Sequence, residues 1–302
     1  MTATHPDQGE ALNPPAASVV AAIVANALAE DRAGFDVTTR ATVTPDQRGE
    51  ATILYKQDGV VCGIDVVAHV FRQVNPGIAL HATTPEGAWV ESGSVVATVK
   101  GPLGPMLSGE RVALNLMQRM SGIATLSRQY VEAAAKGGRA RVVDTRKTTP
   151  GLRALERYAV RVGGARNHRD TLQDGVLIKD NHIEAAAHRG VAIPALLAAV
   201  RAEVPHTLRL EIEVTTPAMA FAALEGGADV ILLDNMTPEM MAAIVADARK
   251  EPAYARVLFE ASGGITFATI ADVAATGVDL ISCGALTHSA PALDISLDVR
   301  PA

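Results

Sequence analysis

The sequence predicts an α/β protein in which a smaller layer of strands and helices precedes a series of βα units. Apolar residues make up 48% of its 302 residues, but aromatic residues only 3%. The core must therefore be built from Ala, Val, Leu and Ile, which suits parallel strands covered by helices. From residue 139 onward, apolar runs that end in polar residues alternate with helical patterns, as βα units require.

Short strand patterns separated by Gly, Pro and Asp characterise the chain up to residue 100. Residues 1–14 have the composition of a disordered segment, and residues 16–29 predict an amphipathic helix after two prolines. Residues 34–39 are expected to form a loop. The other elements predicted here resemble a separate α+β layer: strands at residues 51–56, 60–62, 78–83 and 95–99 and a helix at residues 64–74.

A long helical pattern follows at residues 109–136, after a break rich in Gly and Pro at residues 101–105. Ser121-Gly122 is expected to bend or divide this helix, and Arg119 to be one of its solvated residues. The predicted domains are an N-terminal one (residues 1–117) and a C-terminal one (residues 118–289). The last segment, 290–302, alternates apolar and acidic residues and could return as a strand to the first domain's sheet.

Six apolar runs in the C-terminal part each end in a polar or small residue, at Asp144, Lys179, Glu213, Asp234, Ser262 and Gly284. Successive run ends are 21 to 35 residues apart, which is the length of a βα unit. The predicted helices between them cover residues 152–162, 193–203, 217–225, 238–250 and 266–276. Such a series predicts a parallel α/β barrel or a doubly wound sheet, and polar residues at the carboxyl ends of the strands favour the barrel, with its site at that face.

Positive charge is concentrated in one stretch of an otherwise acidic chain. Residues 139–179 contain ten basic and four acidic residues, a net charge of +6, while the whole chain carries −6. Arg146 and Lys147 follow one buried strand pattern directly, and Lys179 follows the next. Together with His168 and Arg169, these cations predict a site for an anionic ligand at the rim of the sheet. The alternative for any one of them is a rim salt bridge with a neighbouring aspartate.

Carboxylates end two other strands. Glu213 and Asp234 each close an apolar run, and a carboxylate pair beside phosphate-binding cations suggests Mg²⁺ and sugar hydroxyls as ligands. Glu211 shares a face of its strand with Glu213, so either could point inward. The alternative is that Glu213 and Asp234 neutralise Lys147 and Lys179 structurally.

Two Gly-containing turns end the last two units. Ser262-Gly263-Gly264 and Ser282-Cys283-Gly284-Ala285 both stand between a strand and a helix, where backbone N–H groups can approach a phosphate. We interpret His168, beside Arg169, as a hydrogen-bond donor rather than a general base. Cys62 and Cys283 lie far apart, which argues against a disulfide framework and fits a reducing cytosol.

Several classes of protein are disfavoured by composition. No apolar run is long enough to span a bilayer, and no basic residue precedes residues 16–29 as a signal peptide would require. We therefore expect a cytoplasmic protein without a membrane association. The low aromatic content disfavours base stacking and hence nucleic-acid binding.

A set of motifs occurs in a fixed order along the chain: Asp36-Val37-Thr38-Thr39, Gly109-Glu110-Arg111, Ser121-Gly122-Ile123-Ala124-Thr125, Asp144-Thr145-Arg146-Lys147-Thr148, Asn167-His168-Arg169, Ile178-Lys179-Asp180-Asn181-His182, Glu211-Ile212-Glu213-Val214, Leu233-Asp234-Asn235, Glu260 with Ser262-Gly263-Gly264-Ile265, and Gly284-Ala285-Leu286-Thr287-His288-Ser289. In combination, these motifs resemble those of the quinolinate phosphoribosyltransferase family, the decarboxylating pyrophosphorylases of NAD biosynthesis. Ala165 and Ala261 depart from residues common in the family, but neither change removes a charged group.

The resemblance implies an N-terminal α/β sandwich, a C-terminal open α/β barrel, and a homodimer in which Arg111 reaches the partner's site. It implies transfer of a phosphoribosyl group from phosphoribosyl pyrophosphate (PRPP) to quinolinate with decarboxylation. Lys147, Lys179, Glu213 and Asp234 would be catalytic, and Glu213 and Asp234 would also hold Mg²⁺. The implied substrate-binding residues are Arg111, Thr145, Arg146, Lys147, His168, Arg169, Lys179, Glu213, Asp234, Ser262, Gly263, Gly264, Gly284 and Ala285.

Three alternatives remain open at this point. A related phosphoribosyltransferase would take another aromatic acid such as nicotinate, which lacks the second carboxylate. A Schiff-base aldolase would use Lys147 or Lys179 as its nucleophile. A barrel that binds an anion without catalysis would release no pyrophosphate.

Overall fold

The computed structural model describes residues 13–301, so the prediction of disorder for residues 1–14 lies almost wholly outside the described residues. The chain forms two compact units. Unit 1 comprises residues up to Arg128, Thr148–Gly164 and the segment from Leu286 onward, and unit 2 comprises Gln129–Lys147 and Ala165–Ala285. No described helix is both long enough and apolar enough to cross a membrane.

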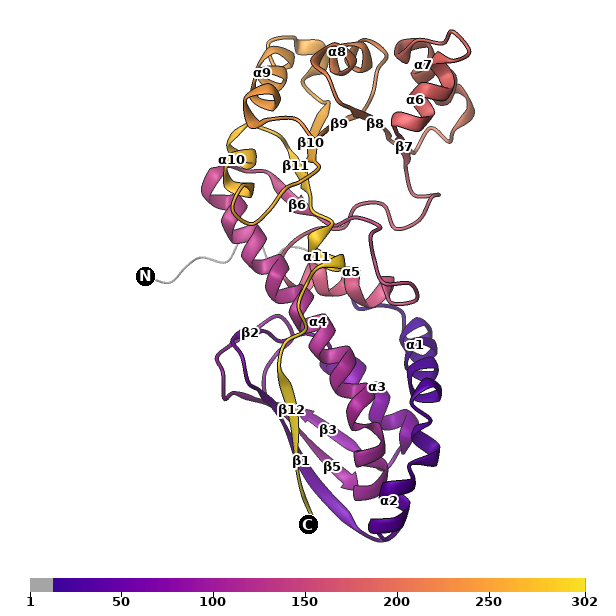
Figure 1. The fold of residues 1–302 in the computed structure, drawn as a ribbon, viewed down its shortest axis with the longest axis vertical. Helices are drawn as coiled ribbons and strands as arrows, with labels where there is room; N and C mark the ends of the chain where they lie inside the picture. Colours follow the sequence, from indigo (N-terminus) through magenta and orange to yellow (C-terminus); the bar gives the residue numbers. More distant parts are fainter. Residues whose placement is uncertain (1–12, 302) are drawn as a thin grey trace. The chain divides into compact units, whose positions relative to one another are not determined.

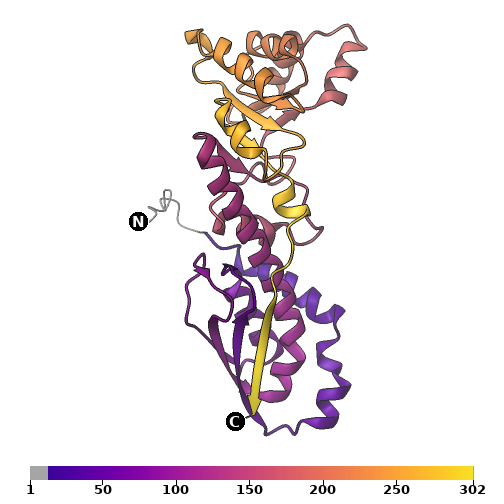
Figure 2. The same ribbon diagram turned by 60° about the vertical axis from the view of Figure 1, so that its left-hand side comes forward.

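Unit 1 is built on a four-stranded antiparallel sheet in the order β12-β1-β5-β3. Its strands are β12 (Ile295–Pro301), β1 (Arg48–Tyr55), β5 (Val95–Pro102) and β3 (Ala79–Ala82), and a small second sheet pairs β2 (Gly59–Val60) with β4 (Trp89–Val90). Burial alternates along β1, with Ala51, Ile53 and Tyr55 facing the core. Helices α1 (Ala17–Glu30), α3 (Ile64–Val74) and the first part of α4 lie on one face of this sheet (Figures 1 and 2). The C-terminal strand thus belongs to this sheet.

Helix α4 (Leu103–Gly137) is one continuous helix of 35 residues, which corrects two expectations. It begins at Leu103, inside the predicted break, because Pro105 stands in the first turn, where its missing N–H costs no helical hydrogen bond. It does not divide at Ser121-Gly122. A Cβ on Gly122 would lie 1.9 Å from the carbonyl oxygen of Pro291, so this glycine permits a close backbone approach.

The expected loop at residues 34–39 is also corrected. A short 3₁₀ helix, η1 (Ala33–Phe35), is followed by α2 (Val37–Thr42). The carboxylate of Asp36 accepts the backbone N–H of Thr39 at 3.0 Å, so Asp36 is the N-cap of α2. The sequence signal for this helix was the aspartate itself.

Unit 2 is built on a six-stranded parallel sheet in the order β6-β11-β10-β9-β8-β7. The strands are β6 (Arg141–Val143), β7 (Val176–Ile178), β8 (Leu210–Val214), β9 (Val230–Asp234), β10 (Leu258–Ser262) and β11 (Leu280–Ser282). From β7 to β11 each strand pairs with the next one along the chain, and β6 pairs with β11. Among the described residues β6 and β7 do not pair, so the barrel is open at that point, as predicted.

Helices connect the strands of unit 2, as the βα spacing predicts. They are α6 (Asp180–Ala187), α7 (Ile193–Glu203), α8 (Pro217–Glu225), α9 (Pro238–Ala248) and α10 (Ile270–Ala275), with a 3₁₀ turn, η2, at Pro252–Tyr254. Figure 1 shows them in red to yellow around the sheet. Two further helices, α5 (Arg153–Val162) after β6 and α11 (Ala285–His288) after β11, belong wholly or mainly to unit 1.

Candidate active site

Strand register places four of the predicted residues on one face of the unit 2 sheet. In a parallel pair, residues opposite each other point to the same face. Glu213 is opposite Leu232, Leu232 is opposite Glu260, and Asp234 is opposite Ser262. Lys179 continues from Ile178, which is opposite Ile212, and so lies level with Glu213. Lys179, Glu213, Asp234 and Ser262 therefore share one face at the carboxyl ends of their strands.

Lys179 and Glu213 form an ion pair at this rim. The Lys179 Nζ lies 3.4 Å from Glu213 Oε2, and 49% of the lysine side chain is exposed. An exposed pair of this kind contributes about 1 kcal/mol or less to stability. The ion pair therefore contributes little to the stability of the fold. Lys179 can leave Glu213 and bind a ligand with only a small loss of free energy.

The segments that directly follow β9 and β10 are in contact with each other. Asp234 accepts the side-chain amide of Asn235 at 2.6 Å, and the backbone N–H of Asn235 donates to Ser262 O at 3.0 Å. Asn235 itself has a φ of 54°. Gly263 has a φ of 87°, and a Cβ on it would lie 2.3 Å from the Asn235 side-chain oxygen. Only glycine fits this position, for reasons that hold with or without a bound phosphate.

The end of β6 is organised by a buried carboxylate. Asp144 is fully buried and accepts the Asn167 side-chain amide at 2.6 Å and the backbone N–H of His168 at 2.8 Å. Arg166 forms a parallel bridge with Val143, so the segment that carries His168 and Arg169 runs alongside the free edge of β6. This places two distant parts of the cationic stretch next to each other.

Arg146 and Arg169 lie close enough to influence each other. Burial of Arg169 and then the positive charge of Arg146 lower the pKa of its guanidinium, while Glu211 opposes the shift. One Arg169 nitrogen donates to Gly175 O at 3.1 Å. Two neighbouring guanidinium groups favour an anion that bridges them, and their planar forks match carboxylates.

Thr145 and Lys147 flank Arg146 in the sequence. The Thr145 hydroxyl accepts the backbone N–H of Lys147 at 3.1 Å, and the Lys147 side chain is exposed.

The predicted site residue His168 forms a cluster with two buried carboxylates, Glu211 and Glu260, that were not predicted as site residues. His168 Nε2 lies 3.0 Å from Glu211 Oε2 and 3.7 Å from Glu260 Oε2. Burial, followed by the charge of Glu211, raises the pKa of Glu260 to about 7. Burial disfavours the charged imidazole, but the hydrogen bond to Glu211 and the nearby carboxylates raise the pKa of His168 on balance. The available signal was that Glu260 shares a strand face with Ser262.

Arg111 and Arg119 both lie on α4 in unit 1. Arg111 is exposed and belongs to unit 1, whereas the other predicted site residues belong to unit 2. The expectation that Arg119 is a solvated residue was wrong. Its guanidinium pairs with the buried carboxylate of Glu156 at 2.8 Å and donates to the carbonyl oxygens of Thr287 and Ala290. Arg119 therefore has a structural role within unit 1.

The last predicted residues lie after β11. Gly284 and Ala285 are half-buried at the start of α11, immediately beyond the strand end. Cys283 donates its backbone N–H to Val143 O at 3.0 Å, which ties this turn to the end of β6. The turn thus adjoins the strand that leads to Arg146 and Lys147.

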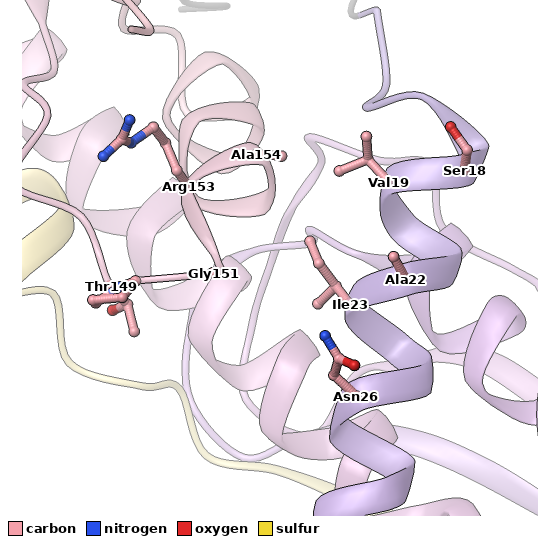
Figure 3. Close-up of a pocket in the computed structure, with 10 residues that line it drawn as sticks. Ser18, Val19, Ala22, Ile23, Asn26, Thr149, Gly151, Arg153 and Ala154 are labelled. Carbon is pink, nitrogen blue, oxygen red and sulfur yellow. The ribbon is translucent and has the colours of Figure 1, made fainter.

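A separate pocket lies within unit 1, between α1 and the segment from Thr149 to Ala154 (Figure 3). Val19 and Ile23 point from α1 towards that segment, whereas the Arg153 side chain is directed away from α1 (Figure 3). Arg153 is the only charged residue among those that line the pocket. None of the predicted site residues contributes to it, so this pocket offers no support for a catalytic role.

Comparisons with known proteins identify the family to which both parts of the chain are similar. The family model of the quinolinate phosphoribosyl transferase N-terminal domain matches residues 36–121, and that of the C-terminal domain matches residues 123–298. The chain is 42% identical over 272 residues to a probable nicotinate-nucleotide pyrophosphorylase (carboxylating) of Synechocystis, with 90% of each chain covered. It is 42% identical over 279 residues to the Mycobacterium leprae protein named nicotinate-nucleotide pyrophosphorylase (carboxylating), covering 91% and 95%.

Solved structures show the same likeness. The nicotinate-nucleotide pyrophosphorylase from Francisella tularensis superposes with a TM-score of 0.88 at 32% identity, over 98% of this chain and 100% of that one. Human nicotinic acid phosphoribosyltransferase, at 16% identity and a TM-score of 0.55 over 92% of this chain and 73% of that one, shares the fold alone.

Proposed function

The chain belongs to the quinolinate phosphoribosyltransferase family, and we propose that it transfers the phosphoribosyl group of PRPP to quinolinate with decarboxylation. The products are nicotinate mononucleotide, CO₂ and pyrophosphate, and the reaction serves de novo NAD biosynthesis. The observation that carries the proposal is the proximity of Arg146 to Arg169, together with Lys147 just after β6 and Lys179 just after β7. Such a density of cations suits an acceptor with two adjacent carboxylates together with a pyrophosphate donor.

We assign the acceptor to the cationic side of the site. Thr145, Arg146, His168 and Arg169 form its wall, with the two guanidinium forks bound to the carboxylates. Nicotinate, which lacks the second carboxylate, would leave one half-buried guanidinium without a carboxylate partner, and that penalty is the basis of selectivity against it.

We assign PRPP to the strand ends between β7 and β11. Lys147 and Lys179 bind its pyrophosphate as point charges, and backbone N–H groups of Ser262, Gly263, Gly264, Gly284 and Ala285 bind the remaining phosphate oxygens. Glu213 and Asp234 bind the ribose hydroxyls. Lys179, Glu213 and Asp234 lie on the same face of the sheet, which supports their assignment to one ligand.

Glu213 and Asp234 are also the residues that we propose for Mg²⁺. They offer hard carboxylate oxygens from neighbouring strands on one face, which is the donor chemistry that this ion prefers. When bound, the ion would neutralise charge on the pyrophosphate. Lys179 already pairs with Glu213, so a cation at Glu213 would release Lys179 towards the phosphates.

The reaction needs positioning and charge more than covalent chemistry. The ring nitrogen of quinolinate attacks the anomeric carbon while the bond to pyrophosphate breaks and its electron pair leaves with the pyrophosphate. Glu213 and Asp234 stabilise the positive charge that develops on the sugar, and Lys147 and Lys179 stabilise the leaving group. The bond between the carboxylate and the ring carbon next to the quaternised nitrogen then breaks as CO₂ departs. Its electron pair stays on that ring carbon, where the adjacent positive nitrogen stabilises it, and a proton adds there in place of the carboxylate.

The chain is further proposed to act as a homodimer. Arg111 is exposed on α4 and belongs to unit 1, so it is available to contribute to the site of a second copy. A site completed in this way would place three guanidinium groups around the acceptor. Equilibrium sedimentation of the wild-type protein, together with mixing of Arg111→Ala and Arg169→Ala chains, tests this: complementation of activity in the mixture is expected.

The decisive experiment measures pyrophosphate and CO₂ release from PRPP and Mg²⁺ with quinolinate, and with nicotinate as the control. Release of both products with quinolinate alone is the expected result. Pyrophosphate without CO₂, or turnover of nicotinate, would show that the acceptor is wrong. If borohydride treatment in the presence of a carbonyl substrate left a stable covalent adduct on Lys147 or Lys179, the result would favour the Schiff-base aldolase instead.

A further inference from the structure

Both ring nitrogens of His168 have a partner within unit 2. Nε2 lies 3.0 Å from Glu211 Oε2, and Nδ1 lies 2.8 Å from the backbone nitrogen of Arg169. A backbone N–H can only donate, so Nδ1 must offer its lone pair, and the imidazole proton must lie on Nε2. The ring therefore accepts a hydrogen bond from the backbone of Arg169, whose guanidinium binds quinolinate in the proposed function, and donates one to the Glu211 carboxylate.

The carboxylates that hold this proton are buried. Glu211 is 7% exposed and Glu260 is 1% exposed. Glu211 Oε1 and both oxygens of Glu260 have no hydrogen-bond partner among the described residues. The nearby Ser282 hydroxyl, which helps to lower the pKa of Glu260, donates to Ala261 O. Burying two acceptors around one N–H is costly, so the arrangement needs a reason beyond packing.

We propose that Glu211, supported by Glu260, is a positioning residue that acts through His168 on Arg169. By accepting the Nε2–H, Glu211 keeps Nδ1 as an acceptor for the Arg169 backbone. That bond fixes the main chain from which the Arg169 side chain reaches the acceptor's carboxylate. The inference rests on the proposed function, because it takes Arg169 as the group that binds quinolinate.

If Glu211 acted only through its negative charge, its replacement would change quinolinate affinity in the opposite direction. A buried negative charge beneath an anion site repels the anion, so removing only the charge should leave quinolinate binding unchanged or make it tighter. Removing the hydrogen-bond acceptor should weaken binding. The pair Glu211→Gln and Glu211→Leu separates the two effects, since glutamine keeps an acceptor oxygen and leucine does not.

The test measures quinolinate affinity by calorimetry, and KM for quinolinate and for PRPP by steady-state kinetics. We expect Glu211→Leu to weaken quinolinate binding about tenfold and to raise its KM equally, with little change in the KM for PRPP. Glu211→Gln should bind as the wild type does, or more tightly. Glu260→Leu should have a smaller effect, because its 3.7 Å distance is longer than a hydrogen bond.

His168 itself supplies a second, independent comparison. Asparagine places its side-chain oxygen near the position of Nδ1 and can still accept the Arg169 N–H, whereas alanine cannot. We expect His168→Asn to retain more quinolinate affinity than His168→Ala. The matched control is Glu86→Gln in unit 1, a half-buried carboxylate that accepts the N–H groups of Gly63 and Ile64. It should lower Tm without changing the KM for quinolinate.

Three outcomes would overturn the proposal. One is a folded Glu211→Leu chain whose quinolinate affinity equals that of the wild type, and another is equal loss in His168→Asn and His168→Ala. The third is one zinc or manganese ion per purified chain that is lost in Glu260→Gln, because Nε2 would then be a metal ligand and not a donor. A wild type that binds quinolinate but releases no pyrophosphate would refute the proposed function alone, and the affinity ratios would still decide the positioning role.

Discussion

Glu211 and Glu213 lie two residues apart on one face of β8, yet their surroundings differ sharply. Glu213 pairs with the half-exposed Lys179, while Glu211 lies with His168 and Glu260 in a buried cluster. Two residues along a strand correspond to roughly 7 Å. That step separates a rim carboxylate, which can change partners when a ligand arrives, from one that is fixed beneath the site and acts only through its neighbours.

The sharpest contrast between rim and buried groups comes from Arg169→Ala. The variant should lose roughly 2–5 kcal/mol of quinolinate binding, because it leaves a desolvated carboxylate unpaired. Calorimetric titration of quinolinate measures the loss, and Lys100→Ala, at an exposed pair with Glu50, is the control. An unchanged quinolinate affinity in Arg169→Ala would remove this residue from the site.

A buried ion pair away from the cationic site extends the comparison to stability. Arg119→Met leaves the Glu156 carboxylate, which is 1% exposed, without its guanidinium partner. We expect the free energy of unfolding to fall by about 3 kcal/mol. Urea denaturation checks this against Lys100→Met, whose exposed pair should cost well under about 1 kcal/mol. Equal losses in the two variants would contradict a structural role for Arg119.

The pH dependence of the free energy of unfolding tests the buried carboxylate of Glu260 directly. The pKa of Glu260 rises from its usual 4.5 to about 7, chiefly through burial. Between these values the folded state binds more protons than the unfolded state, so the free energy of unfolding decreases as pH rises through this range. Glu260→Gln removes that dependence. Its stability relative to the wild type should rise by on the order of 1–3 kcal/mol from pH 4.5 to pH 8.

Thermal or urea unfolding of both proteins across this pH range provides the measurement. Glu50→Gln, at an exposed carboxylate, should show no such trend and serves as the matched control. A stability difference between Glu260→Gln and the wild type that stays constant with pH would mean that Glu260 is ionised throughout and that another cation compensates its charge.

The smallest effect on stability is expected at the rim. Lys179→Ala breaks only a half-exposed pair and should change the free energy of unfolding by about 1 kcal/mol or less. The same variant should raise the KM for PRPP strongly, because it removes a phosphate-binding charge. A large loss of stability with an unchanged KM would reverse this interpretation and make Lys179 a structural residue.

The sequence could predict the βα rhythm and the strand ends, because hydrophobic period and turn residues are local signals. Lys179, Glu213 and Asp234 were found in this way, and parallel register then explains why they share a face. The cluster of His168, Glu211 and Glu260 could not be found, because it depends on which strands become neighbours. Glu260 meets His168 across 92 positions of sequence, a distance that no local pattern encodes.

Long-range packing also explains the local errors. Gly122 looks like a helix breaker until the approach of Pro291 is known, and Arg119 looks solvated until Glu156 and the carbonyl oxygens near residue 290 surround it. In both cases the C-terminal segment supplies the missing partner. Its strand was recognisable from alternation, but its neighbours were not.

The division into units has a consequence for dissection of the protein. The chain passes from one unit to the other after Arg128, Lys147, Gly164 and Ala285, so neither unit is a contiguous segment. A truncation at any one of these points would deprive one unit of its own strands or helices, and a single proteolytic cut there would free neither. Gene fragments that are designed by domain boundary should therefore be inactive alone, and circular permutants that keep both units intact are the better tool for separating their roles.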